Sequence, residues 1–186
     1  MIIAISGKAG SGKSTVAKLL AQKLNLRHYS IGDLMREMAS EKDLTLLELN
    51  RLAEKDSSID FELDQKLKNL GKAKDKFVVD GRLTAFFVPN ADARVFLDAE
   101  DGVRAKRILG DVREEEINKS LNSTISNIKS REASEKLRYK KYYNIDYMDK
   151  SLYNLIIDTS EMTPEEVVDR IVKFIQKMKS KSPMST

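Results

Sequence analysis

Residues 7–15 (GKAGSGKST) form a glycine-rich segment whose residue types suit it to bind phosphate. The segment fits the pattern G-x-x-x-x-G-K-[ST], in which glycines let backbone N–H groups approach phosphate oxygens closely. In this pattern the lysine, here Lys13, bridges the β- and γ-phosphates of a nucleoside triphosphate, and the hydroxyl of Ser14 is a ligand of Mg²⁺. We therefore predict a nucleoside triphosphate site formed by Gly7, Lys8, Ala9, Gly10, Ser11, Gly12, Lys13, Ser14 and Thr15.

The segments on either side of this loop are those that a phosphate site needs. Residues 1–5 (MIIAI) are an apolar run typical of a short buried strand, and residues 16–24 carry apolar side chains at helical spacing. Free N–H groups and the positive end of the helix dipole converge on an anion at such a helix N-terminus. The alternative, a glycine-rich turn that contains a lysine by chance, does not explain why a predicted strand precedes the loop and a predicted helix follows it.

A second informative segment is residues 76–82 (KFVVDGR), an apolar strand that ends in three chemically useful residues. Asp80 stands where an enzyme with such a loop places its second magnesium-organising carboxylate, so we predict a metal site made of Ser14 and Asp80. Gly81 allows close backbone approach, and the guanidinium of Arg82 can bind a phosphate with two hydrogen bonds. The alternative is an ordinary turn after the strand.

Two further pairs of charged residues lie at helical spacing. Asp60 and Asp64 are four residues apart in an expected helix over 59–70 and share a face; the alternative is a pair of solvated carboxylates near a helix N-terminus. Arg131 and Arg138 are seven apart in a long polar helical region, about 114–143, and lie nearly on one face. The alternative there is a solvated helix with salt bridges of Glu132 to Lys136 and of Glu135 to Arg138.

The order of the predicted elements indicates the fold class. Strands alternate with helices and are expected at residues 1–5, 27–30, 76–80, 94–97 and 153–157. This alternation predicts an α/β fold with a five-stranded parallel sheet covered by helices on both faces. Because ligands bind beyond the carboxyl ends of such strands, the glycine-rich loop, Asp80 and the turns at Asp98 and Asp158 should meet at one rim. His28, the only histidine, lies in a strand and is assigned no role.

Composition narrows the class of protein. A chain of 186 residues suits a single domain, here 1–178, with a short polar tail at 179–186 that we expect to fray. The absence of cysteine excludes a disulfide scaffold, a zinc–thiolate site and a cysteine nucleophile. The net charge of +4 comes from interspersed signs, which does not indicate nucleic-acid binding. No run is apolar enough for a membrane span and no apolar helix face is left unpaired, so we expect a cytoplasmic monomer.

Other classes of protein with such a loop fit less well. Guanine-specific switches need an N-K-x-D base reader, and residues 118–121 (NKSL) lack its aspartate. Large motor ATPases need a longer chain. A small-molecule kinase with two mobile insertions, about 33–70 and about 110–143, remains.

The sequence resembles the nucleoside monophosphate kinase family, and within it most closely the archaeal-type cytidylate kinases. Residues 30–36 (SIGDLMR) resemble the family's acceptor-site segment, and residues 59–64 (IDFELD) resemble a pattern of the cytidylate branch. Residues 80–82 (DGR) match the motif after the third strand, and residues 131–139 (REASEKLRY) resemble the lid segment. The resemblance extends from residue 1 to about residue 177.

This resemblance implies a P-loop kinase fold, with an NMP-binding insertion at about 33–70 and a lid at about 110–143. It implies ATP as phosphoryl donor, Mg²⁺ as cofactor and CMP or dCMP as acceptor. The acceptor is already an anionic phosphate oxygen, so catalysis consists of positioning and charge stabilisation and needs no histidine or cysteine base. The implied catalytic residues are Lys13, Arg82, Arg131 and Arg138. The implied substrate-binding residues are Ser30, Asp33, Arg36, Asp60, Asp64, Gly81 and Arg82.

The choice of base rests mainly on the resemblance. The carboxylates of Asp60 and Asp64 suit the N4 amino group of cytosine and disfavour uracil, which presents an acceptor there. Adenine also carries an amino group, although Ile31, where adenylate kinases commonly have a hydroxyl residue, argues against AMP. The alternatives are an adenylate- or uridylate-type kinase, a nucleic-acid-associated P-loop protein and a non-enzymatic ATP-dependent module. Residues 109–121 match no family segment, which leaves Arg104, Arg107 and Arg113 as candidate lid or ATP contacts.

Overall fold

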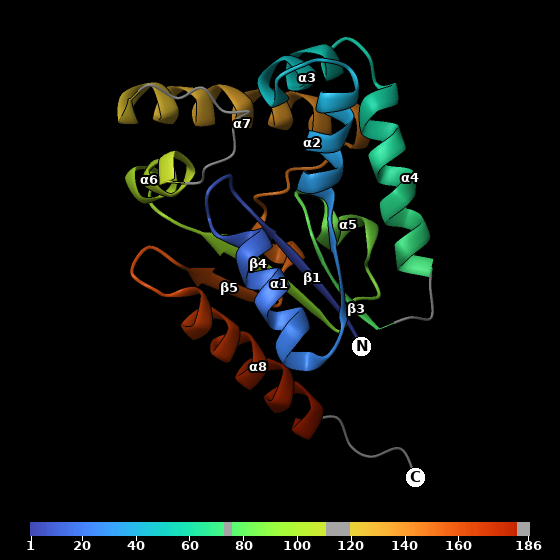
Figure 1. Ribbon diagram of the computed structural model, residues 1–186. Helices are drawn as coiled ribbons and strands as arrows, with labels where there is room; N and C mark the ends of the chain where they lie inside the picture. The colour runs from blue at the N-terminus through green and yellow to red at the C-terminus, as the bar shows by residue number, and fades with distance from the viewer. Residues whose placement is uncertain (73–75, 111–119, 182–186) are drawn as a thin grey trace.

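A five-stranded parallel sheet forms the centre of the computed structural model, which describes residues 1–72, 76–110 and 120–181 (Figure 1). The strands have the spatial order β2-β3-β1-β4-β5. Their bounds are β1 (Ile2–Gly7), β2 (Arg27–Ser30), β3 (Phe77–Asp80), β4 (Ala93–Asp98) and β5 (Leu155–Asp158). The predicted sheet is therefore confirmed in number and direction of strands.

The helices follow the strands along the chain. They are α1 (Lys13–Leu24), α2 (Ile31–Glu41), α3 (Leu46–Ala53), α4 (Ser58–Lys72), α5 (Thr84–Phe87), α6 (Asp101–Gly110), α7 (Leu121–Tyr143) and α8 (Pro164–Lys181), with a short 3₁₀ helix at Lys150–Leu152. Helices α2, α3 and α4 span the residues where we expect the insertion, about 33–70, and α7 crosses the top of the molecule beside α3 and α6 (Figure 1). Among these helices, none is both long enough and apolar enough to cross a membrane.

The alternation of side chains along β1 divides the core into two layers. Ile3 and Ile5 belong to the cluster that packs against α1 and α8, whereas Ile2 and Ala4 belong to the cluster on the opposite face. Successive side chains of a strand point to opposite faces, so a central strand that is buried on both sides reads as a continuous apolar run. This is why β1 could be recognised from its sequence without an alternating pattern.

The register of the sheet brings the carboxyl ends of the strands to one rim. Ser30 of β2 pairs with Asp80 of β3, and Asp98 of β4 pairs with Asp158 of β5. Gly7, at the end of β1, pairs with Leu97. The loop that starts at Gly7 therefore begins between the ends of β3 and β4, as the parallel arrangement predicts.

The ends of the helices differ in part from the prediction. Helix α8 begins with the expected capping box, in which the Glu166 amide donates to Thr163 Oγ1 at 3.2 Å and the Thr163 amide donates to Glu166 Oε2 at 2.8 Å. It continues to Lys181, beyond the predicted end near Met178, because no glycine or proline interrupts the sequence before Pro183. Of the predicted tail, residues 182–186 lie outside the described residues.

Of the long polar helical region expected at about 114–143, the structure describes residues 120–143. Helix α7 starts at Leu121, and a capping box of Ser120 with Ser123 closes its N-terminus. Residues 111–119 of the predicted lid, which include Arg113, lie outside the described residues.

The packing of α1 against the sheet gives a test of the core. Leu20 is fully buried in the layer between the sheet, α1 and α8, so we expect Leu20→Ala to lower the free energy of unfolding by about 2–5 kcal/mol. Leu137, which is 68% exposed on α7, is the control, and Leu137→Ala should change that free energy by less than about 0.5 kcal/mol. Urea denaturation of both variants measures the difference, and equal losses would contradict this assignment of the core.

Candidate functional site

The glycine-rich loop between β1 and α1 has the conformation that the sequence pattern predicts. Gly10 and Gly12 have φ angles of 72° and 85°, in the left-handed region that favours glycine. A Cβ atom on Gly10 would lie 2.6 Å from the carbonyl oxygen of Arg104, so this position also has no room for a side chain. The loop is thus packed against α6, and Gly12 at its end is the N-cap of α1.

Lys13, the first residue of α1, lies inside this loop. It is 8% exposed, and its Nζ donates a hydrogen bond to the carbonyl oxygen of Lys8 at 2.7 Å. Burial, reinforced by the charge of Arg82, holds the pKa of Lys13 well below its ordinary value, although Asp80 and Glu135 oppose that shift. A phosphate bound beside Lys13 would stabilise the charged form of its amine.

Asp80, at the end of β3, is buried and accepts hydrogen bonds from several elements. Ser14 Oγ donates to its Oδ2 at 2.8 Å and Ser30 Oγ donates to the same oxygen at 3.3 Å. His28 Nε2 lies 2.7 Å from its Oδ1. The structure therefore brings the predicted pair of Ser14 and Asp80 together, and it adds His28, to which the sequence assigned no role. The signal for His28 was its place two residues before Ser30, on the same face of the strand.

The hydroxyl of Ser14 and the carboxylate of Asp80 fit Mg²⁺. This ion prefers oxygen ligands and commonly takes only one or two from the protein, with waters and substrate phosphates completing its shell. In the described part of the chain, no group of three or more histidine or acidic side chains could hold a metal ion by itself. A magnesium ion here would therefore depend on the phosphates that the loop binds.

A buried carboxylate, that of Glu135 on α7, holds two predicted catalytic arginines. Arg82 Nε donates to its Oε2 at 2.7 Å, and Arg131 Nε donates to its Oε1 at 3.2 Å. Burial by itself would raise the pKa of Glu135, but the charges of Arg82 and Arg131 lower it to about 2. Arg82 Nη1 also donates to the carbonyl oxygen of Gly7 at 3.1 Å, and its Nη2 is buried without a hydrogen-bond partner in the described part of the chain. That nitrogen is a buried donor on a residue that lines the cavity described below.

Asp60 and Asp64 on α4 are buried, so the alternative of two solvated carboxylates is wrong. Asp60 Oδ2 lies 3.2 Å from Nε of Arg138, and the hydroxyl of Tyr143 donates to Asp64 Oδ2. Burial raises the pKa of Asp60 to about 6 against the opposing charge of Arg138. Burial also raises the pKa of Asp64, to about 7.

Arg138 does not reach the glycine-rich loop, in contrast to the prediction that it acts on phosphate with Arg131. Its guanidinium is 1% exposed and donates to the main-chain oxygen of Asn50 at 2.8 Å and to Asn50 Oδ1 at 3.1 Å. Seven residues of helix advance by about 10 Å along the axis, so two arginines on one face reach places far apart. Arg138 instead pairs with Asp60, and the expected pair of Glu135 with Arg138 is replaced by the pairs of Glu135 with Arg82 and Arg131.

The other predicted acceptor-site residues divide into two groups. Arg36 and Gly81 line the cavity described below. Ser30 and Asp33 lie behind them: Ser30 Oγ accepts a hydrogen bond from the Asp33 amide and caps α2, and the Asp33 carboxylate pairs with Arg36.

The two described candidate arginines of α6 have different surroundings. Arg107 lines the cavity and donates to the hydroxyl and the carbonyl oxygen of Thr159, at 2.9 and 2.6 Å. Thr159 in turn donates to the carbonyl oxygen of Ser11 at 3.1 Å, so the turn after β5 is tied to the loop. Arg104 is buried beneath the loop and does not line the cavity.

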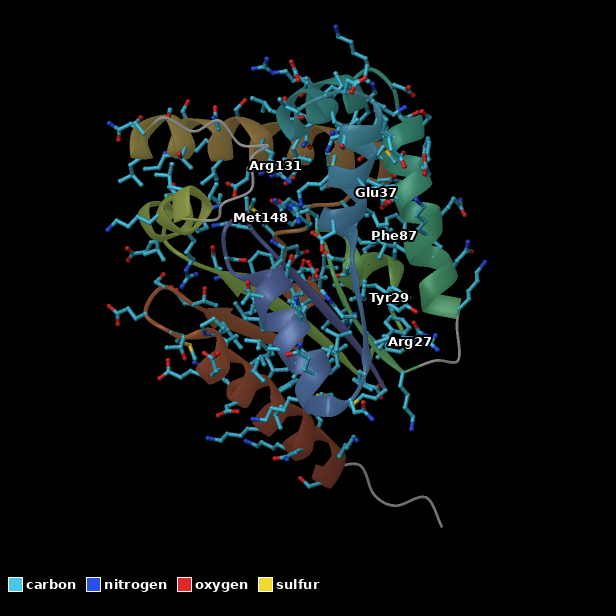
Figure 2. All side chains as sticks on the ribbon, in the orientation of Figure 1. Arg27, Tyr29, Glu37, Phe87, Arg131 and Met148 are labelled. Atoms are coloured by element: carbon cyan, nitrogen blue, oxygen red, sulfur yellow. The ribbon has the colours of Figure 1, made fainter. Side chains whose placement is uncertain are left out.

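These groups surround a continuous cavity of about 610 Å³. One end is formed by the loop residues with Lys13, Arg82 and Arg131, and the other by Asp60 and Asp64. Figure 2 shows Arg131 below α7, between that helix and the sheet. The cavity therefore offers a strongly cationic end for phosphates and a pair of carboxylates for a group that donates hydrogen bonds.

Comparison with known proteins agrees with this geometry. The sequence model of the cytidylate kinase-like family matches residues 2–161. A cytidylate kinase of Natronomonas pharaonis is 45% identical over 168 residues, which cover 90% of this chain and 85% of the relative. A cytidylate kinase of Methanosphaera stadtmanae is 42% identical over 96% of this chain and its own full length.

Solved structures share the fold at low identity. A shikimate kinase from Bacteroides thetaiotaomicron has a TM-score of 0.65 at 16% identity and covers 95% of this chain and 98% of its own. A shikimate kinase from Aquifex aeolicus has a TM-score of 0.58 at 21% identity, with 98% and 100% covered. These similarities show a P-loop kinase fold.

The ion pairs of Glu135 predict a pH dependence of stability. The pKa of a glutamate in an unfolded chain is about 4.3, whereas that of Glu135 in the folded protein is about 2. The carboxylate therefore stabilises the fold fully above about pH 5, and this contribution is lost as the pH falls toward 2. Glu135→Gln should strongly lower the free energy of unfolding at pH 7. The difference in this free energy between the wild type and the variant should become smaller between pH 5 and pH 3.

Urea denaturation over this pH range measures the effect. Glu62→Gln, which removes an exposed carboxylate on α4, is the control and should differ little from the wild type at any pH. A difference in the free energy of unfolding between the wild type and Glu135→Gln that stays constant from pH 6 to pH 3 would contradict a lowered pKa of Glu135.

Proposed function

Because the chain belongs to the cytidylate kinase-like family, we propose that its site transfers the γ-phosphoryl group of ATP to CMP or dCMP. The products are ADP and CDP or dCDP. The observation that carries this function is that a single cavity joins a phosphate-binding loop with Arg82 and Arg131 to the buried carboxylates of Asp60 and Asp64. A nucleoside monophosphate has a phosphate and a hydrogen-bonding base at its two ends, so it matches the two ends of this cavity.

In this proposal the phosphoryl donor, ATP, binds to the glycine-rich loop. The backbone N–H groups of the loop and Lys13 bind the β- and γ-phosphates of ATP, as in other enzymes with this loop. Ser14 and Asp80 would hold Mg²⁺, which when bound neutralises charge between these phosphates. His28 and Ser30 keep the Asp80 carboxylate in place, since both contact its oxygens.

The transfer step needs little covalent chemistry from the protein. A phosphate oxygen of the acceptor attacks the γ-phosphorus in line with the leaving oxygen of ADP. Lys13, Arg82 and Arg131 stabilise the charge that spreads over the transferred group, and the unpartnered Nη2 of Arg82 is a preorganised donor for it. Glu135 fixes the two guanidiniums, so they do not have to reorganise at the moment of reaction.

The end of the cavity that holds Asp60 and Asp64 selects the acceptor nucleotide by its base. An ionised Asp64 accepts a hydrogen bond from the N4 amino group of cytosine, whereas uracil presents an oxygen at that place. Arg36 and Gly81 also line the cavity, and we assign them to the sugar and phosphate of the acceptor. We assign Arg138 to this end, where it holds Asp60 and so acts through that carboxylate on base binding rather than on the transferred phosphate. The monomeric state, the cytoplasmic location and the absence of nucleic-acid binding stay predictions.

The direct test is release of ADP by the purified protein with Mg·ATP and each of CMP, dCMP, UMP, AMP and GMP. We expect CMP or dCMP to be preferred, and Lys13→Ala to lose about 10²–10³ in kcat, the loss typical of removing one charge-stabilising donor. Preference for AMP or UMP would support a monophosphate kinase activity but overturn the roles assigned to Asp60 and Asp64. No stimulation by any acceptor would refute the proposed function.

The raised pKa of Asp64 predicts how cytidylate phosphorylation depends on pH. Only the ionised carboxyl can accept hydrogen bonds at both oxygens, from the Tyr143 hydroxyl and from the N4 amino group, so its contribution to kcat/KM should rise as the pH increases from about 6 to about 8. The amide of Asp64→Asn does not titrate, and the loss of kcat/KM in this variant at pH 8 should correspond to about 1–3 kcal/mol.

The measurement is the ratio of kcat/KM for the wild type to that for Asp64→Asn at each pH. The acceptor phosphate also titrates in this range, but it does so equally for both proteins and cancels in the ratio. A ratio that does not change with pH would contradict a catalytic contribution from the ionised form of Asp64.

A further inference from the structure

Arg104 on α6 is a fully buried arginine to which the steps above assign no role. Its side chain is 1% exposed and contacts three different parts of the chain. Nη1 donates to the carbonyl oxygen of Ala9 at 3.1 Å and to Oε1 of Glu132 at 2.5 Å. Nη2 donates to Oδ1 of Asp101 at 2.5 Å. A charge buried to this extent is costly unless paired, so these contacts constrain all three partners.

The first contact orients a peptide group of the phosphate-binding loop. In a trans peptide the carbonyl of Ala9 and the N–H of Gly10 point in opposite directions. Because Arg104 lies beneath the loop and binds that carbonyl, the Gly10 N–H is directed to the other side, where Ala9 and Gly10 line the cavity. Arg104 thus keeps a carbonyl dipole away from the phosphates and turns a donor toward them.

The second contact fixes α7 relative to the same loop. Glu132 directly follows Arg131 in the sequence and is mostly buried, with 15% of its side chain exposed. Its pairing with Arg104 sets the rotation and height of α7 at this turn, and therefore the direction from which Arg131 and Glu135 enter the cavity. Without Glu132, the only carboxylate that pairs with Arg104 in the described part of the chain would be Asp101, on the same helix.

We propose that Arg104 is a positioning residue that joins the phosphate-binding loop to α7, so that the Gly10 N–H and the Arg131 guanidinium are presented to the same phosphates. The proposal rests on the proposed kinase function. Arg104 does not contact the substrates, because its side chain lies beneath the loop and not on the cavity wall. Its effect should therefore appear in the rate of transfer more than in the binding of nucleotide.

The two carboxylate partners of Arg104 provide a matched pair of variants. Glu132→Gln removes the charge that belongs to α7. Asp101→Asn removes the charge that belongs to α6, from a residue that is 46% exposed. Asp101 also lies 3.8 Å from Lys129 of α7, but both side chains are exposed and such a pair contributes little. Each change takes one carboxylate from the same guanidinium, but only the first one removes the buried ion pair that joins Arg104, and with it the loop, to α7.

The experiment measures kcat and the KM values for ATP and CMP in these variants and in Arg104→Lys. Glu132→Gln should lower kcat by roughly tenfold or more, with the KM for ATP changed by less than about threefold. Asp101→Asn should lower kcat by less than about threefold, and Arg104→Lys should retain more activity than Arg104→Ala. Equal losses in kcat for Glu132→Gln and Asp101→Asn, or no loss for either, would overturn the proposal.

Hydrogen exchange of the ligand-free proteins tests the link without the reaction. The amides of residues 128–136 should exchange faster in Glu132→Gln than in Asp101→Asn, because the former breaks a buried ion pair of α7 and the latter only an exposed one. Equal exchange in the two variants would also overturn the proposal. If the wild type fails to phosphorylate any monophosphate, the proposed function fails, while this comparison still decides whether Arg104 joins the loop to α7.

Discussion

The structure depends on how a buried concentration of positive charge is held together before any phosphate binds. Lys13, Arg82 and Arg131 converge on one end of the cavity, where their mutual repulsion and the cost of burial oppose the folded state. The carboxylate of Glu135 offsets this by pairing with both arginines. Such a buried network adds little net stability, but it fixes the guanidiniums in space, which is what stabilising a transferred phosphoryl group requires.

Ion pairs of buried charges also occur along α7, whose buried face combines Glu135 and Arg138 with the apolar Ile128 and Tyr139. Glu132, Glu135 and Arg138 follow one another at intervals of three residues and therefore share a face. Glu132 pairs with Arg104 beneath the phosphate-binding loop, Glu135 pairs with Arg82 at the end of β3, and Arg138 pairs with Asp60 on α4. One weakly apolar helix thus connects the donor end, the reacting centre and the acceptor end through three ion pairs.

This arrangement explains how a small chain with no cysteine and one histidine supports phosphoryl transfer. The acceptor is already a nucleophilic anion, so the protein has to bring two polyanions together and to exclude water. Buried arginines would bring the two polyanions together. Residues of α2, α4 and α7 line the cavity, and these helices would help to exclude water from it. The single histidine, His28, lies 2.7 Å from the Asp80 carboxylate and is not among the residues that line the cavity.

The sequence by itself determined what depends on contiguous residues. The glycine-rich loop, the apolar strand before it and the Asp80-Gly81-Arg82 turn were recognisable because local spacing dictates their backbone and their chemistry. The parallel sheet followed from the alternation of strands and helices, and the rim followed from the sheet. What only the tertiary structure decided was which charges meet.

Arg82 and Glu135 are 53 residues apart in the sequence, and Arg138 and Asn50 are 88 apart, so no local pattern relates them. Their pairing depends on where α7 crosses the sheet and on how far each turn of that helix lies along its axis. Burial then determines which of several possible salt bridges form, because a charge removed from water must take the partner that the fold places beside it.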